Sequence, residues 1–376
     1  MVSGSTPGGK VPVSAECVPL IILLRPDAGL PERSTVRSAL DELTATVEET
    51  RLGDRIAFVL TGPSDRPADA LARLPGVDRV VDLSHGKSLV EGTRDVEGRG
   101  RCVAIGSARF GGGQAAVIAG PCTVESREDL AAIARHARDG GAAALRGGAF
   151  KVRTSPHAYQ GGGARALAEL AAVARDVDLP FVSELTDPRQ VEVLADQLDA
   201  IQIGARHMQN FPLLVEAGRS GKPILLKRHM AADVEEWLLA AEYILKTGNE
   251  QVILCERGVK TSDRHVRFLL DVGVVPALKR RIGLPVIVDP SHAAGDWRLV
   301  PALAKAAIAA GADGLLIEMH PRPETTRCDA FQALPVDDFR SLLGDVRQLL
   351  ALDGRSLSSP GSSSEPGTAS STAASA

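Results

Sequence analysis

Eight short apolar runs, evenly spaced from Ala115 onward, constrain the fold of this chain more than any other feature. They read AAVIAGP, AALRGGAF, PFVSEL, AIQIGA, PILLKR, QVILCERG, PVIVDPSH and GLLIEMH. Helical segments lie between them, for example SREDLAAIARHARDG and ADVEEWLLAAEYILKTG, with Ser126 and Asp233 as expected N-caps. Eight buried parallel strands alternating with helices over roughly 240 residues predict an α/β fold, a (β/α)8 TIM barrel. An open doubly wound sheet is the alternative, but it seldom uses eight such evenly spaced units.

A second, shorter alternation precedes the barrel. Residues 18–85 follow the order strand, helix, strand, strand, helix, strand, which predicts a ferredoxin-like (α+β) domain, a fold often used for regulatory modules. Residues 1–17 are expected to form a flexible arm, and residues 86–112, rich in glycine and mixed charge, a linker. The catalytic barrel is expected over residues 113–352. Residues 353–376 are almost devoid of large apolar side chains, so we expect a disordered C-terminal tail.

Composition excludes several classes of partner. The 376 residues carry 43 Lys and Arg against 47 Asp and Glu, a formal charge of -4, which is not the cationic footprint of a nucleic-acid-binding protein. Aromatic residues make up 3%, too few for a base-stacking platform. The apolar run from Val18 to Leu24 is too short to cross a membrane, and a signal-peptide pattern does not precede it. Five cysteines without framework spacing indicate free thiols, so we expect a cytoplasmic protein.

Basic side chains gather where the expected strands end. The junctions after strands two, four, five and six supply Arg146, Lys151, Arg153, Arg206, Lys227 and Arg257, while strand three supplies Glu184. These junctions face one mouth of a TIM barrel, where active sites lie. Because unpaired buried cations are costly, six of them in a mildly acidic chain indicate ligands with several negative charges, such as phosphates and carboxylates. Ion pairing with neighbouring carboxylates explains any one cation, but poorly explains all six.

Three potential metal ligands follow strands one, seven and eight, which become neighbours when a barrel closes. They are Cys122, His292 and Glu318, and Asp329 in the next loop is available as a fourth. Thiolate, imidazole and carboxylate together suit a divalent transition metal such as Mn, Fe, Co or Zn. Singly, Cys122 is more often a packing residue and His292 a structural one; their convergence favours a metal site. A nucleophilic Cys122–His292 dyad is a further alternative, but it leaves the cations unexplained.

Seven strings identify a family resemblance. The segments AGPCTVES, LRGGAFKVRTSP, IQIGARHMQN, LLKR, CERG, VDPSHAAG and IEMHPRPE, in order between about Ala115 and Leu350, resemble 3-deoxy-D-arabino-heptulosonate 7-phosphate (DAHP) synthases of the type I beta group. The first 85 residues are similar in pattern to the amino-terminal ferredoxin-like regulatory domain found in that group. The resemblance implies metal-dependent condensation of phosphoenolpyruvate with erythrose 4-phosphate, the first step of the shikimate pathway. The metal would polarise the aldehyde for attack by C3 of the enol; water then adds at C2 and phosphate leaves with C–O cleavage.

The resemblance also implies residue roles. Metal ligands would be Cys122, His292, Glu318 and Asp329. Phosphoenolpyruvate would meet Arg146, Lys151, Glu184, Arg206, Lys227 and Arg257, and the aldose phosphate would meet Lys151, Arg153 and Thr154. Lys151 would act as a catalytic residue with Cys122 and His292, either protonating the new alkoxide or holding the carboxylate. An aromatic amino acid inhibitor and a homo-oligomer, tetramer or dimer, are further implications.

Three residues depart from the family pattern. Val152 replaces a proline, His207 ends a segment that usually reads A-R-N, and His229 replaces the glycine of K-R-G. The phosphoenolpyruvate contacts are intact, so these changes bear on the acceptor aldehyde. The alternatives are an octulosonate-type synthase and a relative working in secondary metabolism. A catalytically idle barrel is disfavoured, because all expected ligands and cations are present.

Two further residues flank the expected metal ligands. Cys328 immediately precedes Asp329, and we hypothesise that oxidation joins it to Cys122 and ejects the metal. His320 lies two residues beyond Glu318, where it is either a neighbour of the metal ligands or a loop residue.

Overall fold

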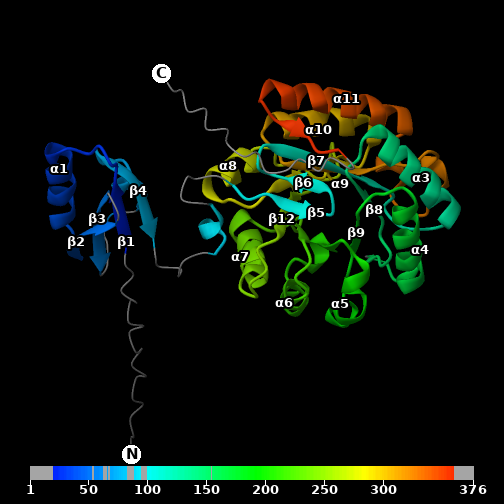
Figure 1. Ribbon diagram of the computed structural model, residues 1–376, viewed down its shortest axis with the longest axis horizontal. Helices are drawn as coiled ribbons and strands as arrows, with labels where there is room; N and C mark the ends of the chain where they lie inside the picture. Colours follow the sequence, from blue (N-terminus) through cyan, green and yellow to red (C-terminus); the bar gives the residue numbers. More distant parts are fainter. Residues whose placement is uncertain are drawn as a thin grey trace, which may run out of the picture. The chain divides into compact units, whose positions relative to one another are not determined.

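Two units make up the chain, Met1–Ser88 and Leu89–Ala376, and each is described by itself (Figure 1). The computed structural model describes residues 20–52, 55–61, 66, 68–82, 89–94, 100–153 and 155–359. The arm expected at residues 1–17 and the predicted contact Thr154 lie outside the described residues.

The N-terminal unit has the predicted order of elements. They are β1 (Leu20–Leu24), α1 (Leu30–Asp41), β2 (Thr46–Leu52), β3 (Arg55–Thr61), α2 (Ala68–Leu71) and β4 (Val77–Asp82). The sheet order is β2-β3-β1-β4 with antiparallel pairs, which is the ferredoxin-like arrangement. Alternate residues of β1 point inward, so Ile22 packs with Leu40 of α1 and Phe58 of β3 in one core.

The second unit is the predicted (β/α)8 barrel. Its strands are β7 (Gln114–Gly120), β8 (Ala144–Arg146), β9 (Phe181–Glu184), β10 (Ala200–Ile203), β11 (Ile224–Lys227), β12 (Val252–Glu256), β13 (Val286–Val288) and β14 (Gly314–Glu318). Each pairs in parallel with the next, and β14 pairs with β7 to close the sheet. All eight predicted strands are therefore confirmed.

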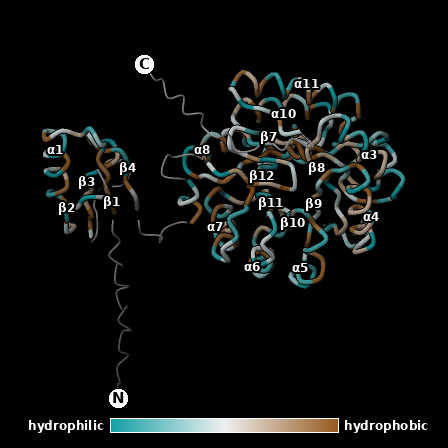
Figure 2. The backbone as a smooth tube through the Cα atoms, in the orientation of Figure 1, coloured by the Kyte–Doolittle hydropathy of each residue, from teal (hydrophilic) through white to brown (hydrophobic). Residues whose placement is uncertain are grey.

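Helices surround this sheet (Figure 1). They are α3 (Arg127–Gly140), α4 (Gly163–Asp176), α5 (Pro188–Leu194), α6 (Phe211–Arg219), α7 (Val234–Leu245), α8 (Val274–Arg281), α9 (Pro290–Ala294), α10 (Val300–Ala309) and α11 (Val336–Leu352). The predicted caps are confirmed, because the side chains of Ser126 and Asp233 accept hydrogen bonds from the first turns of α3 and α7. Every residue of β10, β11, β12 and β14 is buried, and the hydrophobic colouring in Figure 2 follows these inner strands.

The prediction of a linker at residues 86–112 is wrong for its second half. Residues 103–110 form an antiparallel hairpin of β5 (Val103–Ile105) and β6 (Ala108–Phe110). Its apolar side chains pack with residues from the starts of the barrel strands, including Ala116, Ala144 and Ala200. The hairpin therefore closes the amino-terminal end of the barrel, opposite the mouth at which the strands end.

The disorder expected from residue 353 is wrong for the residues that follow α11. Strand β15 (Ser356–Leu357) adds to β7 in parallel, and Ser358 Oγ accepts a hydrogen bond from Arg109 N at 3.1 Å. These hydrogen bonds stabilise residues 356–358, although the composition of this segment predicts no ordered structure. Residues 360–376 lie outside the described residues.

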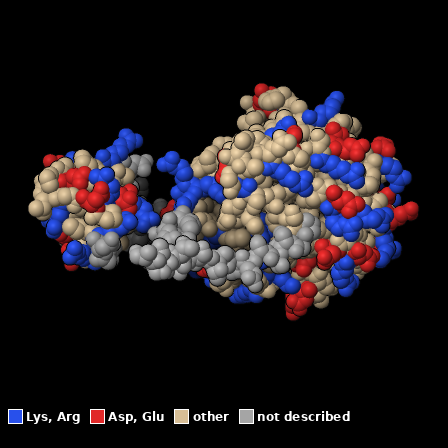
Figure 3. All heavy atoms as spheres, turned by 45° about the horizontal axis from the view of Figure 1, so that its top comes forward, with Lys and Arg blue, Asp and Glu red and all other residues tan. Residues whose placement is uncertain are grey.

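Charged side chains of both signs cover the barrel unit. On the face drawn in Figure 3, basic and acidic side chains are interspersed over the barrel unit rather than gathered by sign. Among the described residues, the helices are too short or too polar to cross a bilayer.

Candidate metal centre and active site

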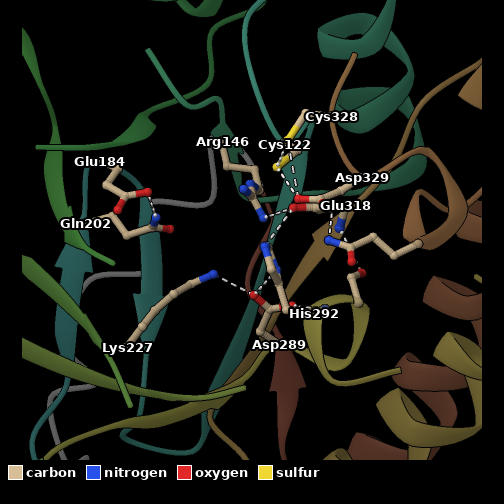
Figure 4. A network of polar contacts seen from close by, with 12 residues as sticks. Cys122, Arg146, Glu184, Gln202, Lys227, Asp289, His292, Glu318, Cys328 and Asp329 are labelled. Atoms are coloured by element: carbon tan, nitrogen blue, oxygen red, sulfur yellow. Dashed lines mark hydrogen bonds and ion pairs between the residues drawn. The ribbon is translucent and has the colours of Figure 1, made fainter. Parts of the chain in front are cut away.

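Four acidic, thiol and imidazole side chains converge at the mouth of the barrel (Figure 4). Cys122, His292, Glu318 and Asp329 each offer one ligand atom, and these atoms all lie within 4.8 Å of one another. The first three are buried and Asp329 is half-buried. Closure of β14 onto β7 brings the ends of these strands together, so side chains separated by up to 207 positions in sequence come into contact.

Cys122 is held in place by a close approach of two strand ends. Gly120 has φ +151°, and a Cβ there would lie 2.2 Å from Arg146 O of β8. Beyond it, Gly148 N donates to Cys122 O at 3.2 Å, extending the parallel pairing of β7 and β8. Only glycine at position 120 permits this approach, which directs the Cys122 thiol into the mouth.

His292 is positioned by Asp289, a residue missed as a site residue in the sequence analysis. Asp289 Oδ1 caps α9 by accepting from His292 N at 2.9 Å. Its Oδ2 lies 2.7 Å from His292 Nδ1 and 2.6 Å from Lys227 Nζ. The imidazole therefore presents Nε2 to the cluster, 3.2 Å from Glu318 Oε1. A carboxylate that orients a histidine in this way is typical of metal sites.

Glu318 and Asp329 complete the cluster. Glu318 Oε2 accepts from Gln332 Nε2 at 2.5 Å, and Arg146 Nη1 lies 3.1 Å from Glu318 Oε1. Asp329 adopts φ +55°, an uncommon conformation for a non-glycine residue, just before a short 3-10 helix (Ala330–Gln332). This conformation turns its carboxylate toward Cys122, whose Sγ lies 3.1 Å from Asp329 Oδ2.

The protonation states suit metal binding. Burial lowers the pKa of His292 to about 4, despite the opposing charges of Asp289 and Glu318, so its imidazole is neutral at pH 7. Burial alone would raise the pKa of Asp329, but His292 and Lys151 hold it well below its usual value. A neutral imidazole beside ionised carboxylates is the form in which these side chains bind cations.

The predicted basic residues divide into three groups. Arg146 and Lys227 are buried against Glu318 and Asp289, respectively. Lys151 Nζ lies 2.8 Å from Cys122 Sγ, and Arg153 Nη1 lies 2.5 Å from Cys328 Sγ. Arg257 is buried with its guanidinium 4.4 Å over the Phe268 ring.

The remaining predicted contacts lie farther round the mouth. Arg206 and Arg257 both lower the pKa of His229, which places these three side chains in one electrostatic environment. Glu184 accepts from Gln202 Nε2 at 3.4 Å, and Figure 4 shows this pair apart from the metal cluster. The structure thus brings the ligands together with four cations, Arg146, Lys151, Arg153 and Lys227, while Glu184 lies at a separate position.

Several buried polar atoms at the mouth have no hydrogen-bond partner among the described residues. They include Arg146 Nη1, Arg257 Nη1, Glu318 Oε1 and His292 Nδ1. Ion pairs nevertheless place Arg146 Nη1 3.1 Å from Glu318 Oε1 and His292 Nδ1 2.7 Å from Asp289 Oδ2. Arg257 Nη1 is the donor of this group that has neither a hydrogen bond nor an ion pair among the described residues. Such groups are rare in folded proteins unless a ligand satisfies them. The Arg257 donor fits an anionic ligand, and the four-residue cluster fits a divalent cation.

The contacts of Cys122 and His320 bear on two alternatives from the sequence. The described hydrogen-bond partners of Cys122 Sγ are Lys151, Cys328 and Asp329, so the thiol is not hydrogen-bonded to His292 as a nucleophilic dyad requires. His320 Nδ1 accepts from Arg322 N at 3.0 Å, and His320 is not one of the four cluster residues.

Comparison with known proteins identifies the family. Residues 101–351 match the model of the DAHP synthetase I family. A relative from Thermotoga maritima, named phospho-2-dehydro-3-deoxyheptonate aldolase, is 40% identical over 282 residues, covering 75% of this chain and 83% of the relative. The chain belongs to the DAHP synthetase I family.

Solved structures of DAHP synthases share the architecture. A crystal structure of the Thermotoga maritima DAHP synthase matches 91% of this chain and 99% of its own, with a TM-score of 0.71 and 34% identity. A truncated form from the same organism matches 69% of this chain and 95% of its own, with a TM-score of 0.64 and 39% identity. A 2-dehydro-3-deoxyphosphooctonate aldolase from Syntrophotalea carbinolica is 34% identical over 268 residues, 66% of this chain and 95% of that protein.

Proposed function

We propose that this chain is a metal-dependent DAHP synthase that condenses phosphoenolpyruvate with erythrose 4-phosphate to give DAHP and phosphate. The observation that carries this proposal is the Cys122, His292, Glu318 and Asp329 cluster, in a mouth where the buried Arg257 Nη1 has no hydrogen-bond partner among the described residues. Membership of the DAHP synthetase I family supports it. The basic side chains suit one substrate with two anionic groups, and the proposed metal suits a second substrate with an aldehyde.

Phosphoenolpyruvate would occupy the basic side of the mouth. Its phosphate and carboxylate together need several donors, which Arg146, Lys227, Arg206 and Arg257 would supply, with Lys151 between them and the cluster. Arg257 Nη1 is a buried donor without a partner, so binding an oxyanion there would cost little reorganisation. The negative charge of Glu184 would attract the Lys151 ammonium group and so orient it toward the substrate carboxylate.

A divalent metal, Mn, Fe, Co or Zn, would be held by Cys122, His292, Glu318 and Asp329. When bound, it supplies a Lewis acid for the aldehyde carbonyl. The protein's own part is to fix the ligands. Lys227 and Arg146 do so by holding Asp289 and Glu318.

The aldose phosphate would approach from the opposite side. Lys151 and Arg153 lie in the segment after β8, and Arg153 contacts Cys328, the neighbour of Asp329 in the segment after β14. Thr154 follows Arg153 in sequence and lies outside the described residues. Arg153 would exchange its contact with Cys328 for the acceptor phosphate. Lys151, charged and adjacent to the cluster, would stabilise or protonate the developing alkoxide.

The test of the function is substrate consumption by purified enzyme loaded with Mn²⁺. Phosphoenolpyruvate should disappear only when erythrose 4-phosphate is present, with release of one phosphate for each DAHP formed. Lack of consumption with Mn²⁺, Fe²⁺, Co²⁺ and Zn²⁺ in turn would contradict the proposal.

A different aldose phosphate acceptor is the second candidate. His229 stands beside Arg206 and Arg257, and His207 Nε2 is a buried nitrogen with no partner among the described residues. His229 stands where the family pattern has glycine, and His207 where it has asparagine. Similarity to an octulosonate-type relative supports an octulosonate or secondary-metabolic reaction as the alternative. A panel of four- and five-carbon aldose phosphates would decide, because the acceptor with the highest kcat/KM is the substrate.

The N-terminal unit would act as a regulatory domain that binds an aromatic amino acid, in a cytoplasmic homo-oligomer, tetramer or dimer. A module that only supports oligomerisation is the alternative. Light scattering of the full chain, with and without tyrosine or phenylalanine, measures the oligomer.

The position of the cut should decide how stable the barrel is without the N-terminal unit. A chain that starts at Leu89 keeps Val90, which is fully buried against the barrel, and Thr93, whose Oγ1 accepts from Gly283 N at 2.8 Å. A chain that starts at Arg101 loses both residues. Loss of the buried valine alone should lower the free energy of unfolding by about 2 kcal/mol. We expect the Leu89 variant to be active and insensitive to the amino acid, with a Tm several degrees above that of the Arg101 variant. Inhibition that survives in the Leu89 variant would contradict the regulatory assignment.

Mild peroxide is expected to inactivate the enzyme by joining Cys122 and Cys328. The two free thiols are buried with their Sγ atoms 3.3 Å apart, so little movement separates them from a disulfide. Each hydrogen peroxide would oxidise two thiols to one disulfide and yield two waters. We expect loss of two titratable thiols and of the bound metal, restored by dithiothreitol. Cys328→Ser should keep its metal under the same treatment; equal metal loss in that variant would contradict the pairing.

A further inference from the structure

Cys328 brings a second sulfur to the proposed metal centre. Its Sγ lies 3.3 Å from Cys122 Sγ and 3.3 Å from Asp329 Oδ2, while Cys122 Sγ lies 3.1 Å from the same oxygen. Figure 4 shows the two sulfurs side by side against the carboxylates of Asp329 and Glu318. The side chain of Cys328 is only 3% exposed. Three donor atoms thus form a nearly equilateral triangle inside the mouth.

The size of this triangle matches one face of a coordination shell. Metal–sulfur bonds of about 2.3 Å and metal–oxygen bonds of about 2.1 Å place neighbouring ligands at right angles about 3.1–3.3 Å apart. The three observed separations fall in this range. Ligands on opposite sides of one ion stand about 4.4 Å apart by the same bond lengths. His292 and Glu318 complete the four-residue cluster with Cys122 and Asp329. Cys328 Sγ is not within 4.8 Å of all four ligand atoms, so the Cys328 side chain would have to move toward the cluster to bind the same ion.

The surrounding charges also suit two thiolates rather than one. Lys151 Nζ donates to Cys122 Sγ at 2.8 Å, and Arg153 Nη1 donates to Cys328 Sγ at 2.5 Å. Each sulfur therefore faces its own cation. Ordinary packing explains a buried thiol, but it does not explain a guanidinium directed at its sulfur. A thiolate that binds a cation on one side and a guanidinium on the other is satisfied in both directions.

We propose that Cys328 is a fifth protein ligand, so that the centre holds its ion through two thiolates. This inference rests on the proposed function, because it extends the metal centre of that function. Binding breaks the S–H bond of the thiol and forms a sulfur–metal bond, and the proton leaves to solvent. Two thiolates make the site soft, so Co²⁺, Zn²⁺ and Fe²⁺ bind in preference to Mn²⁺.

The test is the absorption spectrum of the Co²⁺-loaded full-length protein, whose sulfur-to-cobalt charge-transfer band increases with each bound thiolate. We expect one Co²⁺ per chain in wild type and in Cys328→Ser, with the band of the variant falling to about half, since one soft ligand remains. Cys122→Ser should lose a similar share. X-ray absorption of the Zn²⁺-loaded proteins should count two sulfurs in wild type and one in Cys328→Ser. Cys102→Ser is the matched control, because that thiol is exposed, and its spectrum should equal wild type.

The possible failures can be told apart. If wild type binds Co²⁺ and Cys328→Ser keeps the full band while Cys122→Ser abolishes it, Cys328 is not a ligand and the metal centre stands with one thiolate. If wild type binds none of the soft metals, the centre itself fails, and the proposed function with it. A sulfur count of one in wild-type Zn²⁺ protein overturns the two-thiolate centre in either case.

Discussion

Replacing Cys122 with alanine should weaken binding of the metal and lower kcat/KM by about 10³-fold, because a Lewis acid contributes several kcal/mol of transition-state stabilisation. Cys122 stands at the centre of the cluster, with contacts to Lys151, Cys328 and Asp329. The truncation removes the donor but leaves Asp289 and the capped α9 intact, so the fold should persist. Metal content by inductively coupled plasma analysis and steady-state kinetics measure the two effects together.

The exposed thiol provides a matched control for this experiment. Cys102→Ala removes a thiol of the same chemistry away from the mouth and should leave metal content and kcat/KM unchanged. A Cys122→Ala protein that retains one tightly bound ion and wild-type activity would contradict the proposed centre. Loss of activity with full metal content would instead place Cys122 outside the ligand set and in a direct chemical role.

The barrel and the convergence of its ligands could be predicted because both follow from local pattern. Fully buried parallel strands read as continuous apolar runs, as β12 and β14 show. Once eight such runs are counted, closure makes the first and last strands neighbours. Cys122 and Glu318 then meet without any knowledge of side-chain contacts.

The hairpin at residues 103–110 could not be predicted because its partner is distant in sequence. Strands of three residues carry too little alternation to be recognised, and the surrounding glycines and charges resemble a linker. Phe110 is fully buried only because the starts of the barrel strands enclose it. β15 was missed for the same reason, since its partner β7 lies more than 200 positions away.

Asp289 was visible in the sequence, but its role was not. The string DPSH fits both an N-cap and a histidine-orienting carboxylate, and the contacts show that one side chain does both. Lys227 then becomes a residue that positions Asp289, as well as a potential substrate contact. Such dual use depends on the distances between three side chains, from the end of β11, the N-cap of α9 and α9 itself, which no spacing rule specifies.

The departures from the family pattern have different backbone consequences. Among the described non-glycine residues, positive φ occurs at Asp178 and Asp329, so His229 replaces glycine without backbone strain. Asp329 does adopt the unfavourable conformation, at a cost on the order of 1 kcal/mol, and it does so beside the proposed ion. Strain at this position is consistent with selection for ligand placement rather than for stability.

Replacing Lys151 with methionine should lower kcat by about 10²–10⁴-fold while leaving one metal per chain, the range expected for a lost acid or charge at the reacting centre. Burial opposes the charge of Lys151, but Cys122, Glu184 and Glu318 outweigh it and raise the pKa of the ammonium group. Lys151 therefore stays protonated across the physiological range. Its Nζ lies 2.8 Å from Cys122 Sγ, so the positive charge is adjacent to the position at which the alkoxide develops.

Arginine at the same position separates the two roles open to Lys151. Lys151→Arg keeps the charge but its guanidinium does not give up a proton. If Lys151 only holds the substrate carboxylate, the arginine variant should recover the KM for phosphoenolpyruvate and most of kcat. If it protonates the alkoxide, KM should recover while kcat stays low. Lys246→Met, which removes an exposed lysine at the end of α7, should match wild type. A Lys151→Met enzyme with unchanged kcat and KM would exclude both roles, because an ammonium next to the reacting atoms that contributed to either step could not be removed without cost.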